Sequence, residues 1–477
     1  MKHEVIWTSK DMAAATKGSV THEFTATGVS IDTRTIKKGE TFLALKGDKL
    51  DGHDYVAAAF KAGASSAIVS KDFKPADASW PLLVVGDTME ALVALGHAAR
   101  DRATATVIGV TGSAGKTGTK EMLYTMLEAL GKTHASKKSF NNHWGVPLTL
   151  SNLAPDAKYA VFEMGMNHTG EMAQLTQQVR PQIVLITTIE PAHIEHFKTV
   201  EAIADAKAEI FQSMDDKGIA ILPADNQHFR RLKAAAEKQG LRKIYGFGED
   251  EEAQIRLVDC TLHADSSRVT ADILGERVKY RLAIPGKHIV INSLAALAAV
   301  KLAGGNLTEA VEALKNSEPV EGRGNRRLLT LVEGQPPVVI IDESYNANPT
   351  SMVAALKVFE MVVPVEGGRR IAVLGDMLEL GKDGPRLHAD IANPLLKAKA
   401  DVLYCCGPLM DALYQALPPD WRGAHTHDSK ELAAVVTGIV KPGDVLLVKG
   451  SAGSKMGYII HALQSLQQDK GHKRHVV

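Results

Sequence analysis

The chain has 477 residues, enough for two or three packed domains and too many for one small module. Its 55 basic and 55 acidic side chains cancel, which argues against a general nucleic-acid or membrane-surface binder, because such binding needs a basic excess. Hydrophobic residues make up 45% of the chain and charged residues 23%, values typical of a globular protein and unlike those of a disordered one.

The cysteines and the apolar runs indicate a cellular compartment. Cys260, Cys405 and Cys406 suit neither a disulfide framework nor the paired Cys-x-x-Cys spacing of a zinc site. The first residues lack the apolar segment of a secretory signal, and no run approaches the roughly 18 apolar residues that a membrane span requires. We expect a soluble cytoplasmic protein, without stable membrane insertion, that works as a monomer.

From residue 105 onward, short apolar runs alternate with loops and with runs of helical periodicity. This alternation predicts an α/β fold in which helices join the strands of parallel sheets. The predicted strands lie at Thr106 to Val110, Tyr159 to Phe162, Ile183 to Thr187, Val338 to Ile341, Ile371 to Leu374 and Val445 to Val448. Shorter runs occur earlier, at Thr41 to Leu45, Ala67 to Ser70 and Leu82 to Val85.

Two polar stretches divide the chain. The first part ends in the charged residues 100–102, and a basic, glycine-containing stretch at 321–327 separates a helical pattern from a new series of strands. We therefore predict domains at residues 1–102, 103–320 and 321–477. The second stretch is either a plain linker or the carrier of an interdomain arginine that reaches a phosphate.

A glycine loop follows the strand that ends at Val110, and apolar residues then recur at helical spacing up to Gly131. In such a strand, loop and helix, backbone N–H groups turn inward around phosphate oxygens. Lys116 adds a positive charge, and the Thr117 hydroxyl at the helix start can bind magnesium. The sequence predicts a nucleotide phosphate site at Thr111, Gly112, Ser113, Ala114, Gly115, Lys116 and Thr117.

Lys207 occupies a place where an apolar residue is expected. Apolar side chains repeat at steps of three and four between residues 199 and 214, and Lys207 fills the missing position. Burying an ammonium is unfavourable unless it is paired. Three explanations are therefore open. A carboxylate such as Asp205 or Glu209 pairs with the ammonium of Lys207, the aliphatic part of the side chain lets the ammonium reach water, or the charge of Lys207 has been changed by a chemical modification.

Two acidic residues and a histidine follow predicted strands. Glu163 and Asp342 each come after an apolar run, at the carboxyl end where open α/β sheets place ligands. Either can be an acidic magnesium residue on these grounds, and the sequence does not rank them. His193 lies just past another strand, where a structural histidine is commoner than a metal ligand.

Together with the phosphate loop, four segments resemble the Mur ligases, which are ATP-dependent amide-forming enzymes of peptidoglycan precursor synthesis. The segments are NNHWGVP at 141–147, EMGMNHTGE at 163–171, DESYNANP at 342–349 and GDMLELG at 375–381. The last two are highly specific, and the likeness runs essentially from end to end.

The resemblance implies three domains. They are a small N-terminal α/β domain for the UDP end of a substrate, a central phosphate-loop ATPase domain with a mainly parallel sheet, and a C-terminal Rossmann-like domain that closes over the nucleotide. ATP and Mg²⁺ are the implied cofactors. UDP-N-acetylmuramoyl-tripeptide and D-alanyl-D-alanine are the implied substrates, joined through an acyl phosphate, and no nucleic-acid partner is implied.

The resemblance also assigns roles to residues. Lys207 matches a lysine that the family carbamylates with carbon dioxide, which gives the misplaced lysine a physical reason. The implied catalytic residues are Lys116, Lys207 and His193, and the implied metal site is Thr117, Glu163, Lys207 and His193. Asn292, Arg323 and Asp342 match nucleotide contacts, so that Asp342 becomes a contact to the nucleotide sugar. The implied substrate contacts are Thr33, Arg34, Lys46, Asn141, Asn142, Asn167, His168, Tyr345 and Asn346.

Three alternatives remain open. Segments near the N-terminus, around residues 32–34, 45–47 and 51–53, can be simple turns instead of substrate contacts. The enzyme can be a related ligase that adds another amino acid, either a Mur ligase or a folate polyglutamylating enzyme. Alternatively, the chain can be a non-catalytic nucleotide switch, which would leave the segment 345–348 unexplained.

Overall fold

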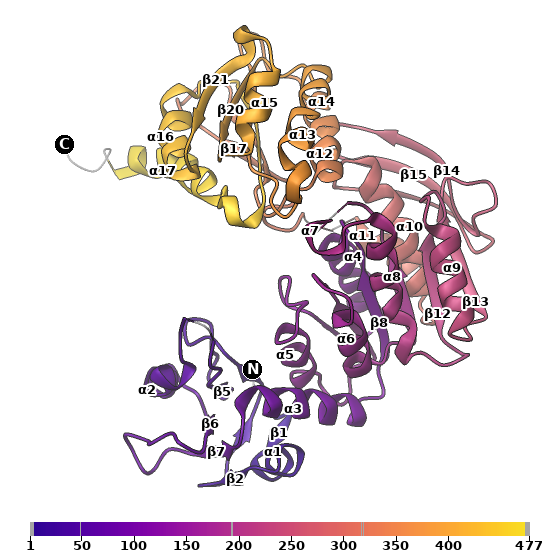
Figure 1. Cartoon of the computed structure of the whole chain (residues 1–477), viewed down its shortest axis with the longest axis vertical. Coiled ribbons are helices and arrows are strands. Elements are labelled where there is room, and N and C mark those ends of the chain that lie inside the picture. Colours follow the sequence, from indigo (N-terminus) through magenta and orange to yellow (C-terminus); the bar gives the residue numbers. More distant parts are fainter. Residues whose placement is uncertain (1–3, 48, 192–193, 316, 318, 473–477) are drawn as a thin grey trace.

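The structure, a computed structural model, describes residues 4–47, 49–191, 194–315, 317 and 319–472, and its sheets form three domains that follow one another along the chain (Figure 1). No helix within these ranges is long and apolar enough to cross a membrane. The three-domain α/β architecture agrees with the prediction from the strand and helix pattern.

The N-terminal domain has a five-stranded sheet in the order β2-β7-β6-β5-β4, with a separate two-stranded ribbon of β1 and β3. The pairs β7-β6, β6-β5 and β5-β4 are parallel, and β2 is antiparallel to β7. Its elements are β1 (Trp7–Thr8), α1 (Ser9–Thr16), β2 (Ser19–Val20), β3 (Thr25–Ala26), β4 (Val29–Ser30), β5 (Thr41–Leu43), α2 (Val56–Lys61), β6 (Ser66–Ser70), β7 (Leu82–Val85) and α3 (Thr88–Arg102).

The central domain has a nine-stranded sheet in the order β16-β15-β14-β13-β12-β11-β8-β10-β9. The strands from β9 to β14 are parallel, and β14, β15 and β16 form an antiparallel extension. Its strands are β8 (Thr106–Thr111), β9 (Thr133–Ala135), β10 (Tyr159–Glu163), β11 (Ile183–Ile186), β12 (Ile219–Pro223), β13 (Lys243–Gly248), β14 (Ile255–Leu262), β15 (Ser267–Ile273) and β16 (Glu276–Leu282). Its helices are α4 (Lys116–Leu130), α5 (Gly145–Ser151), α6 (Glu171–Val179), α7 (Ile194–Phe197), α8 (Val200–Ala208), α9 (Phe229–Lys238), α10 (Lys287–Leu302) and α11 (Leu307–Leu314).

The C-terminal domain has a six-stranded sheet in the order β17-β18-β22-β19-β20-β21, parallel except for β17 at one edge. Its strands are β17 (Asn325–Leu329), β18 (Val338–Glu343), β19 (Arg370–Gly375), β20 (Val402–Cys406), β21 (Arg422–Thr426) and β22 (Val445–Lys449). Its helices are α12 (Pro349–Met361), α13 (Gly384–Ala389), α14 (Ala392–Lys397), α15 (Met410–Ala416), α16 (Ser429–Ile439) and α17 (Gly457–His472).

Both faces of the central sheet are buried. Along β8, Val107 belongs to the apolar cluster on one face, whereas Ile108 and Val110 belong to the cluster on the other. Such two-sided burial explains why the strands read as continuous apolar runs, because helices cover both faces of a parallel sheet. Helix α10 is apolar all round and lies within the second cluster, where it supports the carboxyl end of the sheet.

Asn152 joins the N-terminal domain to the central one. Its side-chain oxygen accepts from the Val29 N–H at 2.9 Å, and its amide donates to the Val29 carbonyl at 2.9 Å. The side chain thus satisfies both backbone polar groups of the first residue of β4, at the edge of the N-terminal sheet. Nearby, the Trp7 indole donates to the Ser151 carbonyl at 2.8 Å.

Replacing Asn152 with alanine should loosen the N-terminal sheet. The change leaves the N–H and C=O of Val29 without partners, so we expect local opening of β4 to become easier by about 2 kcal/mol. Hydrogen exchange of residues 25–45 measures this, and is better suited than a global melt to a protein of three domains. Asn306→Ala, which removes the N-cap of α11, is the matched control. Equal exchange of residues 25–45 in both variants would contradict the prediction.

Candidate active site

The phosphate loop lies between the end of β8 and the start of α4, and two neighbouring side chains clamp it. Gly112 has φ +147° and Gly115 has φ +80°, in the left-handed region that favours glycine. A Cβ at Gly112 would collide with the Thr187 hydroxyl, and a Cβ at Gly115 would collide with the Asn292 amide. The loop therefore needs glycine at both positions for conformation and for space.

Lys116 folds back over this loop. Its ammonium donates to the Gly112 carbonyl at 2.7 Å. Burial lowers the pKa of Lys116, the Glu163 carboxylate opposes that shift, and the positive charge of Arg323 adds to it. The ammonium of Lys116 therefore lies beside the backbone amides of the loop, where a bound anion would stabilise its buried positive charge.

Glu163 is the buried carboxylate of this region. It ends β10, which pairs with β8 so that Glu163 lies opposite Val110. One carboxylate oxygen accepts from the Thr117 hydroxyl at 2.8 Å, and the other accepts from the Asn141 amide at 2.7 Å. The parallel pairing of two strands thus brings together the two predicted metal-site residues Thr117 and Glu163.

Arg323 connects the linker stretch to this site. Its guanidinium donates to the Ser139 hydroxyl at 3.3 Å, and Ser139 lies 3.2 Å from the Thr117 hydroxyl. On its other side the guanidinium lies 4.1 Å from the centre of the Tyr345 ring, in a cation–π contact. The Nε atom of Arg323 is buried without a hydrogen-bond partner among the described residues. Of the two interpretations of the stretch 321–327, this geometry favours the interdomain arginine.

Lys207 is buried, and the predicted carboxylate partners lie elsewhere. Asp205 binds Arg231 at 2.6 Å, and Glu209 accepts the backbone N–H groups of Gly170 and Ala173 at the start of α6. The pairing of Lys207 with either residue was therefore wrong, because α8 ends at Ala208 and a 3₁₀ turn redirects Glu209. Within the described ranges, Lys207 makes no hydrogen bond or ion pair. Burial, and next the charge of Lys116, lowers its pKa well below the usual value.

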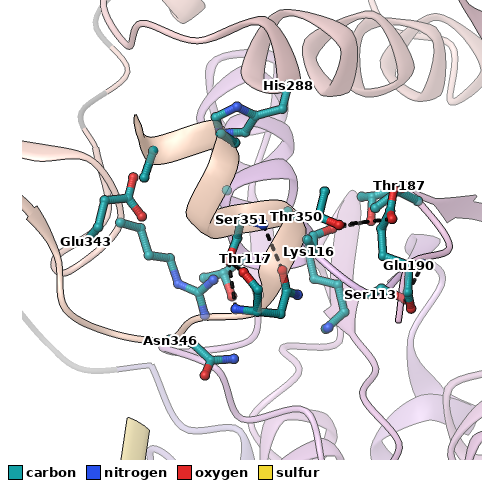
Figure 2. Close-up of a pocket in the computed structure, with 18 of the residues that line it drawn as sticks. Ser113, Lys116, Thr117, Thr187, Glu190, His288, Glu343, Asn346, Thr350 and Ser351 are labelled. Atoms are coloured by element: carbon teal, nitrogen blue, oxygen red, sulfur yellow. Dashed lines mark hydrogen bonds between the residues drawn. The ribbon is translucent and has the colours of Figure 1, made fainter. Parts of the chain in front are cut away.

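A cavity of about 1460 Å³ runs between the central and C-terminal domains and opens onto the phosphate loop. Figure 2 draws residues of both domains that line it, among them Ser113, Lys116 and Thr117 of the central domain and Asn346, Thr350 and Ser351 of the C-terminal domain. The predicted site residues that line it are Ser113, Ala114, Gly115, Lys116, Thr117, Asn141, Asn142, Glu163, Asn167, Asn292, Arg323, Tyr345 and Asn346. Residues of two domains and of the linker therefore share one cavity.

Several predicted residues do not line this cavity. Thr111 and Gly112 are the buried first residues of the phosphate loop, and Lys207 is buried near Lys116. Asp342 is buried at the end of β18, where it accepts from the Ser344 hydroxyl at 2.6 Å and pairs with Arg327 at 3.5 Å. His168 does not line the cavity either, although it lies 3.1 Å from the carboxylate of Glu171, which does. His193 lies outside the described residues.

Thr33, Arg34 and Lys46 lie in the N-terminal domain, away from the phosphate loop. Arg34 binds Asp32 through its side chain at 2.7 Å and its backbone N–H at 3.0 Å, and this bond lowers the pKa of Asp32 to about 2. Lys46 forms an isolated bridge with Asp51. These contacts build local turns, and a substrate role for the three residues stays a prediction.

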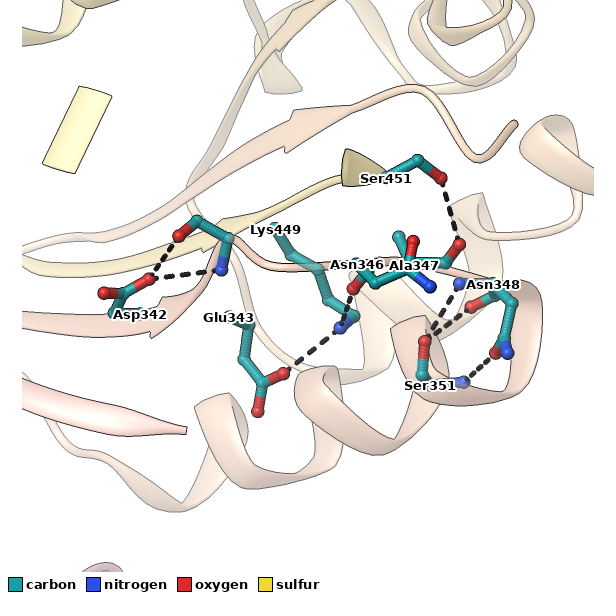
Figure 3. A network of polar contacts seen from close by, with 9 residues as sticks. Asp342, Glu343, Asn346, Ala347, Asn348, Ser351, Lys449 and Ser451 are labelled. Carbon is teal, nitrogen blue, oxygen red and sulfur yellow. Dashed lines mark hydrogen bonds and ion pairs between the residues drawn. The ribbon is translucent and has the colours of Figure 1, made fainter. Parts of the chain in front are cut away.

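A buried ion pair on the C-terminal side of the cavity was missed from the sequence. The Lys449 ammonium lies 3.2 Å from the Glu343 carboxylate and 2.9 Å from the Asn346 carbonyl, and Figure 3 shows both contacts. The Ser451 hydroxyl donates to the Ala347 carbonyl at 3.1 Å. Glu343 and Lys449 end the neighbouring parallel strands β18 and β22 in register, so a charged residue at the end of each apolar run was an available signal.

The donor set near the phosphate loop suits magnesium. Mg²⁺ prefers oxygen ligands and usually takes only one or two carboxylates, with water and phosphate oxygens completing its shell. The touching oxygens of Thr117 and Glu163 meet that requirement. Among the residues that the structure describes, no three or more histidine, cysteine, aspartate and glutamate side chains form a cluster that could hold a metal ion.

These features define a phosphate-loop α/β protein in which the cavity at the phosphate loop is also lined by a second domain. Three domains of one family match it in order. The "Mur ligase family, catalytic domain" matches residues 25–123, the "Mur ligase middle domain" matches residues 110–300, and the "Mur ligase, glutamate ligase domain" matches residues 326–452. The chain belongs to the Mur ligase family.

Its relatives are similar over almost their whole length. The UDP-N-acetylmuramoyl-tripeptide–D-alanyl-D-alanine ligase of Escherichia coli (strain K12) is 34% identical over 447 residues, which cover 93% of this chain and 94% of that protein. The ligase of the same name from Rickettsia prowazekii is 31% identical over 460 residues, 96% of this chain and 100% of that one. The crystal structure of MurF from Acinetobacter baumannii superposes with a TM-score of 0.81 at 30% identity, covering 98% and 100% of the two chains.

The packing of Asn292 against Gly115 predicts that an alanine at this position weakens the binding of ATP, whereas an alanine at a glycine far from the loop does not. Gly115→Ala puts a Cβ against Asn292 at a left-handed position, so we expect at least about tenfold weaker binding of magnesium ATP, the size of effect that a 1.4 kcal/mol loss produces. Gly438→Ala is the control, because its Cβ meets open space within α16, favours the helix and lies outside the cavity. Calorimetric titration measures both affinities. Equal affinity of the two variants would refute the clamp.

Proposed function

We propose that the chain is an ATP-dependent ligase that joins D-alanyl-D-alanine to UDP-N-acetylmuramoyl-tripeptide through an acyl phosphate. The observation that carries this proposal is the shared cavity, which places the phosphate loop of the central domain opposite residues 343–351 of the C-terminal domain. The names of its relatives supply the two substrates. We also expect the enzyme to act as a monomer in the cytoplasm.

In the first step, a carboxylate oxygen of the tripeptide attacks the γ-phosphorus of ATP, and ADP leaves. Both reactants are anions, so the main task of the protein is to hold them in line and to offset their repulsion. Lys116 and the loop amides face the phosphates, and Arg323 brings a second cation from the linker. Bound magnesium, held by Thr117, Glu163 and carbamylated Lys207, would add positive charge at the phosphate oxygens.

In the second step, the amine of the dipeptide attacks the carbonyl carbon of the acyl phosphate. Phosphate leaves, and the amine gives up a proton as the amide forms. Tyr345 and Asn346 lie on the C-terminal side of the cavity, and Asn141, Asn142 and Asn167 lie on the central side. We assign the first pair to the dipeptide and the other three to the peptide carboxylate end, with Asn292 and Asp342 on the nucleotide.

Phosphate release tests the proposal directly. With magnesium ATP and the UDP-muramoyl-tripeptide, we expect release to rise strongly when D-alanyl-D-alanine is added, and mass spectrometry should find the pentapeptide product. Release with another amine donor but not with the dipeptide would assign the chain to a different ligase of the family. Nucleotide binding with no release under any donor would instead favour the nucleotide switch.

Lys207 should carry a carbamate. Its lowered pKa increases the fraction of neutral amine, and a neutral amine can add carbon dioxide, releasing one proton as the N–C bond forms. We expect a carbamate resonance in ¹³C NMR with labelled bicarbonate, and its loss in Lys207→Met. Because protonation restores the ammonium, the resonance should disappear as the pH falls. A wild-type spectrum identical to that of Lys207→Met would exclude the modification.

A further inference from the structure

A second buried lysine, Lys120, lies one helical turn after Lys116 in α4 and has no place in the mechanism above. Its side chain is completely buried. The ammonium donates to the backbone carbonyls of Ser136 at 2.6 Å and Lys138 at 2.9 Å, and it pairs with Glu121 at 2.6 Å. All three of its hydrogens therefore have partners, and two of these partners belong to one loop.

That loop, residues 136–142, surrounds the metal-site pair. The Ser136 hydroxyl accepts from the Glu163 N–H at 3.2 Å, the Ser139 hydroxyl contacts Thr117, and the Asn141 amide donates to the Glu163 carboxylate. Ser139 also receives Arg323 from the linker. Every contact between this loop and the phosphate site thus depends on the path of the backbone between residues 136 and 141.

The path of that backbone is not a relaxed one. Lys138 has φ +50°, in the left-handed region that is unfavourable for a residue with a side chain. A buried charge is also a costly way to hold a helix, since an apolar side chain of similar size would fill the same space more favourably. A fixed ammonium, however, can gather two carbonyls of a strained turn, which an apolar side chain cannot do.

We propose that Lys120 is a positioning residue of the ligase, which fixes the loop 136–142 so that Ser139 and Asn141 meet Thr117, Glu163 and Arg323. This inference rests on the proposed function for its effect on turnover, but its structural part stands independently. Lys120 touches neither nucleotide nor peptide, because it lies outside the cavity that the two would occupy. It therefore acts only through the loop.

Lys120→Met tests the inference, with Lys301→Met as a closely matched control. Lys301 donates to the Ile273 and Leu274 carbonyls, at 3.1 and 3.4 Å, and pairs with Glu276, and Leu274 also has a positive φ of 54°. Its turn joins β15 to β16, far from the phosphate loop in the sheet order. The control thus removes the same type of lysine-to-turn contact at a place without a role in the site.

Two measurements decide the outcome. In Lys120→Met we expect faster hydrogen exchange of residues 136–142, and a kcat that is about 10- to 100-fold lower, with KM for ATP nearly unchanged. Lys301→Met should alter neither quantity. Ser139→Ala added to Lys120→Met should lower kcat by less than the product of the two separate effects, because both act through one loop.

Unchanged exchange of the loop, or an unchanged kcat in an otherwise active enzyme, would overturn the positioning role. If the wild-type enzyme shows no ligase turnover, the proposed function fails, while the exchange measurement still decides whether Lys120 holds the loop. Lys120→Gln keeps two N–H donors without the charge, and it replaces Lys120→Met if that variant does not fold. For it we expect loop exchange and kcat between those of the wild type and a variant without donors.

Discussion

Positive charge is concentrated around the phosphate loop, and the buried carboxylate of Glu163 faces it. Lys116 and Arg323 lie close enough for their charges to interact, an uncarbamylated and protonated Lys207 would add a third cation beside Lys116, and Glu163 is the counter-charge within the same group. Inside a protein such an excess is unfavourable, because water does not screen it. The lowered pKa values of both lysines express this cost. An anionic ligand relieves it, which is why the geometry of this region is best understood as that of an anion site.

The rest of the fold serves to hold these charges at fixed distances. Parallel pairing of β10 and β11 with β8 brings Glu163 and Thr187 to the carboxyl edge, beside the phosphate loop. Helix α10 supplies Asn292 against Gly115 from the other side. The loop is therefore closed in by strand ends and by a helix that is itself buried on all sides. Its shape is set by packing as much as by its own glycines, so that it can meet an anion without rearrangement.

The sequence predicted those parts of the site that depend on local order along the chain. A strand, a glycine loop and a helix are contiguous, and a carboxylate at the end of a neighbouring strand arrives at the same edge, so Thr117 and Glu163 were both candidates, although the strand pattern did not rank Glu163 above Asp342. Contacts between distant segments were not predictable in this way. Ser139 and Arg323 are 184 residues apart, and neither segment has a sequence pattern that predicts their contact. Lys120 looks like an ordinary surface lysine of a helix until the loop that covers it is known.

The two sides of the cavity contribute differently to the charge of the site. On the C-terminal side two pairs of charged residues neutralise each other, Lys449 with Glu343 and Asp342 with Arg327. The charges within each pair largely cancel, and Arg323 of the linker brings a cation to the site from beyond the central domain. This division suits a reaction in two steps. Phosphoryl transfer needs positive charge, whereas the attacking amine must be neutral. Cationic residues close to the amine would favour its neutral form, but they would also repel the ammonium of the dipeptide as it enters. A paired wall receives the dipeptide without that repulsion, and it leaves the stabilisation of the phosphates to the central domain and to the arginine that joins the two.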